Sequence, residues 1–145
     1  MVLTGKRIMD FREMTAEDAA FVAEHSISRG VFAKQEARTE WSYTLEDNGK
    51  VLGVGGIIML TPTTAWAWLD ITEYAMTRIK TCYRVISDWM MVLAKSKGIR
   101  RLQAYIDPSF PQAVRLAEHL NFHRESTMKN FLGDKDADMY VRGVI

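Results

Sequence analysis

Apolar and polar residues alternate along several short stretches of this chain, which is the period expected of strands with one buried face. The alternation predicts strands at 7–12, 40–46, 50–60, 64–71 and 101–106, followed by two strands about Gly133-Asp134. The segment Asp47-Asn48-Gly49 separates two of these strands, and Asn-Gly suits the positive backbone angles of a tight turn. The pattern therefore predicts two hairpins, one near the start and one at the end of the sequence.

Apolar residues spaced by three and four predict the helices. The longest helix runs from about Thr77 to Lys97, and its apolar stripe consists of Ile79, Cys82, Ile86, Trp89, Met90 and Leu93. Thr15 with Asp18 three residues later is typical of a capping box, which predicts a helix over 16–25. A second short helix is expected over 28–37, and Pro111 opens another.

The order of these elements predicts the architecture. The unit 64–71, 77–97 and 101–106 is strand, helix, strand, which implies a parallel crossover inside an otherwise antiparallel sheet. We therefore expect an α/β (α+β) fold, a mixed and mostly antiparallel sheet of about six or seven strands flanked by helices. No linker or repeat divides the chain, so 1–145 is expected to form a single domain.

Composition narrows the function classes. The formal net charge of +1 gives no electrostatic case for binding nucleic acid or a membrane. The lone Cys82 excludes an intramolecular disulfide, and the three histidines form no ligand-spaced set with it, so no metal site is expected. The first residues lack the apolar core of a signal peptide, and no apolar run is long enough to span a bilayer. A cytoplasmic location is the expectation.

Three glycines, Gly53, Gly55 and Gly56, fall inside the strand predicted at 50–60. Glycine inside a strand indicates a bulge or a close approach of another backbone. A nucleotide-binding loop is the competing interpretation, but no predicted helix follows these glycines. A structural role is therefore favoured.

The stretch 100–142 resembles the second half of the GNAT superfamily of acyl-coenzyme A-dependent acyltransferases. That family carries the helix pattern A-x-x-L-Y-x-x-x-G-F, and the packing positions are kept here by Ala113, Leu116, Leu120 and Phe122. Asn121 takes the glycine position, where a left-handed backbone is needed, and Asn adopts it readily. The element order is also similar to the family order along almost the whole chain, and the ending resembles diverged bacteriophage members.

The resemblance implies an N-acetyltransferase that moves an acetyl group from acetyl-CoA to a primary amine on a small molecule or a protein. In the family, coenzyme A enters where the parallel strands splay, and its pyrophosphate lies at the start of the following helix. The implied contacts are Leu69, Ile71, Thr72, Thr77, Arg78, Ile79, Lys80 and Ser109. The segment 72–81 contains no glycine, whereas families usually place a glycine-rich loop there. Its cations also fit the solvated face of an amphipathic helix.

The resemblance also implies catalytic positions. Asp70 and Glu73 lie at or just after the end of the strand 64–71, where families often place the base for the amine. Tyr74 is a candidate proton donor to the departing thiolate, with simple packing as the alternative. Ala117 stands where many members place that tyrosine, and alanine carries no proton to donate. A backbone amide near 69–71 is expected to polarise the thioester carbonyl.

Two losses, the glycine loop and the tyrosine, keep other functions open. The chain is alternatively a non-catalytic GNAT-like module with a protein-binding or virion role, or a sensor that binds acyl-CoA without turnover. A phage origin would place it in the host cytoplasm or the virion. The last hairpin is a candidate edge for a homodimer. Trp66 and Trp68 with Trp41 form either a ligand-binding wall or ordinary core.

Overall fold

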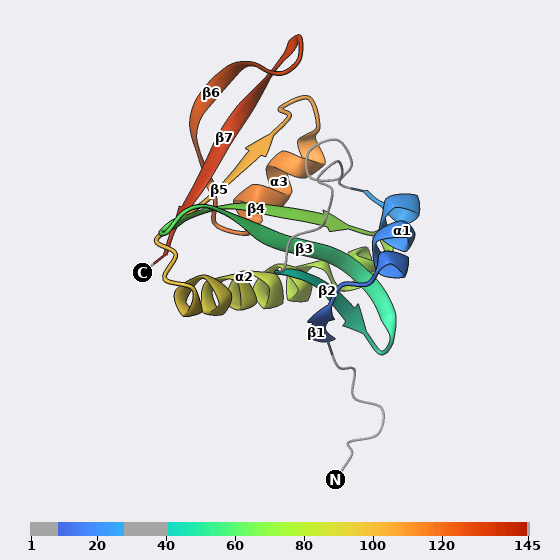
Figure 1. Cartoon of the computed structure of the whole chain (residues 1–145). Helices are drawn as coiled ribbons and strands as arrows, with labels where there is room; N and C mark the ends of the chain where they lie inside the picture. The colour runs from blue at the N-terminus through green and yellow to red at the C-terminus, as the bar shows by residue number, and fades with distance from the viewer. Residues whose placement is uncertain (1–8, 28–40, 145) are drawn as a thin grey trace.

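A seven-stranded mixed sheet organises the computed structural model, which describes residues 9–27 and 41–144 (Figure 1). The strands lie in the order β1-β2-β3-β4-β5-β7-β6. Their bounds are β1 Met9–Glu13, β2 Ser42–Asp47, β3 Lys50–Thr61, β4 Thr64–Ile71, β5 Arg101–Ile106, β6 His123–Leu132 and β7 Lys135–Gly143. Within the described residues, only the neighbours β4 and β5 pair in parallel, as the strand, helix, strand unit predicts.

Helices cover both faces of the sheet. Helix α1 (Ala16–His25) lies on one face, where its Asp18 contacts Arg12 of β1. The neighbouring Phe11 points to the opposite face and stacks on Trp89 of α2 (Ile79–Ser96), with ring centroids 5.0 Å apart. Helix α3 (Pro111–His119) lies beside α2, where the rings of Tyr83 of α2 and His119 of α3 stack with their centroids 4.5 Å apart. Figure 1 shows α2 running along the sheet, and the β6–β7 hairpin extending beyond the other strands.

The turn and cap signals in the sequence are confirmed. Asn48 and Gly49 have φ of 51° and 84°, the left-handed values that a tight hairpin turn needs. Thr15 and Asp18 form the complete capping box at the start of α1. Asn121 has φ of 66° just after α3, so it supplies the left-handed residue that glycine provides in the family pattern.

The predicted start of the long helix was wrong. A 3₁₀ turn, η1 (Glu73–Arg78), precedes α2, which begins at Ile79 rather than Thr77. Arg78 breaks the helical geometry with φ of −136° and ψ of 37°, and its guanidinium donates to Asp47 of β2 at 2.9 Å. This tie to a distant strand fixes Arg78 outside the helix. The short helix predicted at 28–37 lies outside the described residues.

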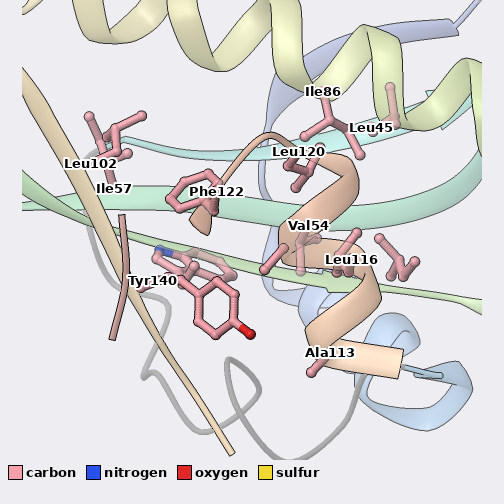
Figure 2. Packing of buried hydrophobic residues seen from close by; sticks show 14 of the residues in the cluster. Leu45, Val54, Ile57, Ile86, Leu102, Ala113, Leu116, Leu120, Phe122 and Tyr140 are labelled. Carbon is pink, nitrogen blue, oxygen red and sulfur yellow. The ribbon is translucent and has the colours of Figure 1, made fainter. Parts of the chain in front are cut away.

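The core lies between the sheet and the layer of α2 and α3. Figure 2 shows Leu116, Leu120 and Phe122 gathered between α3 and the strands, with Ile86 of α2 beside Leu45 of β2. All five side chains are buried. The packing positions inferred from the helix pattern are therefore confirmed as core positions.

A charged network joins α1 to the sheet on the other face. Asp18 is buried and accepts two hydrogen bonds from Arg12, at 2.6 and 2.9 Å, and another from Thr44 at 2.9 Å. Arg12 also donates to Glu46 at 2.9 Å. The guanidinium of Arg12, the backbone amide of Thr15 and the hydroxyl of Thr44 all donate to this carboxylate, and they hold the pKa of Asp18 well below its usual range.

We predict that Asp18→Asn lowers the free energy of unfolding by about 1–3 kcal/mol, because a buried hydrogen-bonded carboxylate is replaced by an amide that satisfies fewer donors. Since the folded state depresses the pKa of Asp18, the contribution is present above pH 4 and is lost as the pH falls below that value. Urea unfolding at pH 7 and at pH 3 measures both effects. The matched control is Glu17→Gln, an exposed carboxylate in the same turn. Equal stability of the two variants at pH 7 would contradict the prediction.

Candidate active site

The parallel strands β4 and β5 pair only at their starts. The pairs are Thr64 with Arg101, Ala65 with Leu102 and Trp66 with Gln103. Beyond Trp66, β4 remains paired with β3 as far as Ile71, and β5 remains paired with β7 as far as Ile106. Each strand is thus held on its outer edge while its inner edge opens, which makes a gap at the carboxyl ends of both strands.

Backbone geometry directs one amide of β4 into this gap. Thr72 donates its amide to Leu52 of β3 at 2.9 Å. Because successive residues of a strand point their amides to opposite edges, those of Ile71 and Leu69 point away from β3. Consistent with this, the Ile71 carbonyl accepts from Ile27 at 3.0 Å, on the edge that β5 has left. The segment after α1 therefore closes the far end of the gap, and the Leu69 amide faces its interior.

An apolar cavity of about 30 Å³ lies beside the gap, on the face covered by α2 and α3. Its walls come from β4, β5 and α3, and include Ala67, Leu69, Ala104, Leu116, Ala117 and Phe122. Ala117 is buried and lines this cavity, so the position that carries a tyrosine in the family pattern does face the gap. The alanine leaves space there and supplies no proton donor.

The start of α2 lacks side-chain caps. Neither Thr72, which precedes η1, nor Arg78, which precedes α2, makes a side-chain cap hydrogen bond. Thr72 is fully buried, and its hydroxyl donates to the carbonyl oxygens of β3 instead. The dipole of a helix favours an anion at this end, where neither residue places a side-chain cap.

The remaining cofactor candidates divide by exposure. Thr77 and Lys80 are exposed around the start of α2, and Ile79 is half-buried there. Arg78 is committed to the buried carboxylate of Asp47. Ser109 lies across the gap, after the end of β5, where its amide and hydroxyl both donate to Asp107. Burial raises the pKa of Asp107, but hydrogen bonds from Ser109 and Lys135 outweigh burial and lower the pKa overall.

The acidic candidates lie on the α1 side of the sheet. Asp70 is buried and accepts a hydrogen bond from the hydroxyl of Ser26, which follows α1. Glu73 is exposed, with its carboxylate 3.6 Å from Nδ1 of His25. Tyr74 packs against His25 and Phe21, and Lys50 Nζ lies 4.0 Å from the centre of its ring. These contacts support the packing interpretation of Tyr74.

An aromatic cluster of Trp66, Tyr105 and Phe131 lies on the same face as Asp70. Tyr105 is 5.6 Å from Trp66 and 5.0 Å from Phe131 between ring centroids. Phe131 is 43% exposed although it is a large apolar residue. Asn130, with φ of 53°, lies in an irregular part of the β6–β7 pairing and turns Phe131 toward the other rings. Trp41 is not part of this cluster, because its ring lies 4.5 Å from Lys97 Nζ on the α2 side.

No family model matches the chain, and the search of curated proteins returned no similar sequence. Solved structures do match. The model superposes on Ard1 from Thermoplasma volcanium with a TM-score of 0.72 and 16% identity, over 94% of this chain and 98% of that one. The Escherichia coli ribosomal-protein-S18-alanine N-acetyltransferase matches with a TM-score of 0.71 and 14% identity, over 94% of both chains. The chain has the GNAT fold.

A third matching structure was solved with its cofactor acetyl-CoA. This protein, yncA from Salmonella typhimurium, matches with a TM-score of 0.67 and 16% identity over 94% of both chains. At these identities the likeness shows the fold alone. The gap between β4 and β5 is the feature of this GNAT fold that bears most on activity.

Two other kinds of chemistry find little support in this GNAT fold. Burial raises the pKa of the Cys82 thiol to about 11, so it is a poor nucleophile at neutral pH. Within 9–27 and 41–144, no three His, Cys, Asp or Glu side chains are grouped to hold a metal ion.

Of the helices in the described ranges, none has the length and hydropathy to cross a membrane.

Sequence analysis missed several residues around the gap. His25 and Ser26 approach Glu73 and Asp70 only because the chain after α1 returns to β4. Asp107 directly follows a buried strand and precedes Pro108, which is a signal for a polar strand end that sequence reading could have used. Its partner Lys135 comes from the distant hairpin, 3.0 Å away, and no local pattern indicates that contact.

Proposed function

We propose that this protein transfers an acyl group from an acyl-coenzyme A, with acetyl-CoA as the smallest donor, to a primary amine. The observation that carries the proposal is the opened inner edge of β4 and β5, with the Leu69 amide directed into the gap and an apolar cavity beside it. An exposed strand edge binds an extended amide-bearing chain by backbone hydrogen bonds, and the pantetheine arm of coenzyme A is such a chain.

The start of α2 would hold the pyrophosphate of the donor. Its uncapped amides and the helix dipole favour an anion, and the exposed Lys80 and Thr77 add a cation and a hydroxyl. Arg78 is the weaker candidate, because Asp47 already neutralises it. Ile71, Thr72, Ile79 and Ser109 would shape the walls around this position. The start of α2 would thus bind the pyrophosphate that a glycine-rich loop binds elsewhere.

The reaction we infer is direct attack of the amine on the thioester carbonyl. The amide bond forms as the carbon–sulfur bond breaks, and the negative charge that develops on the carbonyl oxygen is stabilised by the Leu69 amide. Glu73, which lies beside His25, takes the proton of the amine. The buried Asp70 either holds the segment after α1 in place through Ser26 or takes that proton in place of Glu73. The thiolate takes a proton from solvent, because Ala117 has none to give and Tyr74 is packed against His25 and Phe21.

The acceptor would approach from the α1 side of the sheet. Asp70, Glu73 and the aromatic cluster of Trp66, Tyr105 and Phe131 all lie on that side. Exposed aromatic rings bind apolar surface and the faces of cations. We therefore expect the body of the amine to contact this cluster while its nitrogen reaches the gap.

Charge reversal at the start of α2 tests where the donor binds. Lys80→Glu should weaken the binding of acetyl-CoA roughly fivefold, since reversing one charge beside an anion at a partly exposed site costs about 1 kcal/mol. Calorimetric titration at low ionic strength measures the change. The control is Lys95→Glu, the same substitution on an exposed residue near the opposite end of α2. Equal affinities for the two variants would place the phosphates elsewhere.

The second prediction concerns the base. Glu73→Gln should lower kcat by about 100-fold, because a positioned general base contributes at least that factor, while the dissociation constant of acyl-CoA stays unchanged. Release of free thiol with a panel of primary amines measures the rate. Glu24→Gln, an exposed carboxylate beside His25, is the control.

Asp70→Asn, measured in the same assay, separates the two carboxylates. If both the Glu73 and the Asp70 variants keep the full rate, neither residue is the base. Binding of acyl-CoA by the wild-type protein without turnover of any amine would instead indicate the acyl-CoA sensor.

A further inference from the structure

A second apolar cavity lies on the same face of the sheet as the one beside the gap. Its volume is about 60 Å³, and it lies between α2 and the strands β1 to β4. Its walls include Tyr43, Leu45, Gly55, Ile86, Trp89 and Leu93, and among the residues that the structure describes no lining side chain is charged. We call it the inner cavity, and the one beside the gap the outer cavity.

The two cavities are neighbours. Four residues line both of them, namely Ala67, Trp68, Leu69 and Met90. Met90 of α2 is therefore part of the wall that the two cavities share, together with the three β4 residues. Methionine is unbranched and adapts its shape readily, so among these side chains Met90 moves aside most easily.

Small residues create the inner cavity. Gly53 and Gly55 lie on the face of β3 toward α2, opposite Ile71 and Leu69 of β4, so the floor has backbone where other strands have side chains. A Cβ at Gly55 would lie 2.9 Å from the carbonyl oxygen of Trp68, so even alanine does not fit without a backbone shift. Glycine at this position thus lets β4 pack closely against β3 along this wall of the cavity.

The inner cavity is partly open, and its space exceeds that of a single water molecule, so its lining atoms forfeit contacts with one another. One water-sized group needs about 10–15 Å³. The inner cavity therefore has room for roughly four carbon-sized groups, and the outer cavity for roughly two.

We propose that the outer and inner cavities together take the acyl chain of the donor, which is a medium-length straight-chain acyl-CoA of about six carbons rather than acetyl-CoA. The inference rests on the proposed function, because it needs the thioester to lie at the gap near Leu69. From there the chain passes Ala117 and Ala67, displaces the side chain of Met90 and ends under Ile86 and Trp89. The same bonds form and break as with an acetyl group.

The test compares acyl-CoA chain lengths by calorimetric titration. Each buried methylene contributes a factor of about four in affinity, so hexanoyl-CoA should bind at least tenfold more tightly than acetyl-CoA. Decanoyl-CoA should lose this advantage, because the inner cavity ends before such a chain does. Coenzyme A without an acyl group serves as the reference.

Two substitutions fill the inner cavity alone. Ile86→Phe and Leu45→Phe enlarge residues that line the inner cavity and not the outer one, and they come from different elements, so each checks the other. Both should bring the affinity for hexanoyl-CoA down to that for acetyl-CoA and leave acetyl-CoA binding unchanged. Val92→Phe, at an exposed position of α2, is the control and should change neither.

The outcomes separate this inference from the proposed function. If no acyl-CoA binds, both are overturned. If acetyl-CoA and hexanoyl-CoA bind equally, or if hexanoyl-CoA keeps its advantage in both cavity-filling variants, the acyl-chain site is overturned and the proposed function stands. A chain-length advantage that both variants remove supports the inference.

Discussion

The separation of β4 from β5 is the constraint on which the rest of this structure depends. Pairing on the outer edges is complete, since β4 follows β3 to Ile71 and β5 follows β7 to Ile106. Each strand follows its outer partner, so the β3–β4 pair and the β5–β7 pair separate beyond Trp66 and Gln103. Backbone groups on an opened edge still need partners, and the ligand that we propose would satisfy them. The helix start, the outer cavity and the aromatic cluster all matter because of their place around this gap.

Charged anchors hold the surroundings of the gap. Arg78 bound to Asp47 fixes the turn before α2 against β2, and Arg12 bound to Asp18 fixes α1 on the other face. Each anchor involves a carboxylate that is almost fully buried, so removing the arginine would leave a buried charge without its cation. The start of α2 is therefore positioned by a long-range ion pair.

Local sequence signals predicted what local physics determines. Asn48-Gly49 requires left-handed backbone, and Thr15 with Asp18 satisfies the first amides of α1, so both features were visible in a few residues. The strand, helix, strand order predicted the parallel pair correctly. The predicted start of α2 failed because Arg78 is held by Asp47, which lies 31 residues away and has no mark in the local pattern.

The candidate site was predictable only in part. The sequence places Leu69 and Ile71 at the end of a strand, but the direction of the Leu69 amide follows from the pairing with β3. The inner cavity depends on side chains that are missing at Gly53, Gly55 and Ala67 in two strands and on the helix that spans them. Such a space has no signature in sequence, since it arises from the shapes of several elements at once.

A structure of the protein crystallised with coenzyme A tests the central claim most directly. The account predicts the pantetheine arm between the inner edges of β4 and β5, in hydrogen-bond contact with the Leu69 amide, and the pyrophosphate at the start of α2. Coenzyme A bound on another surface, with the gap unchanged, would contradict the account.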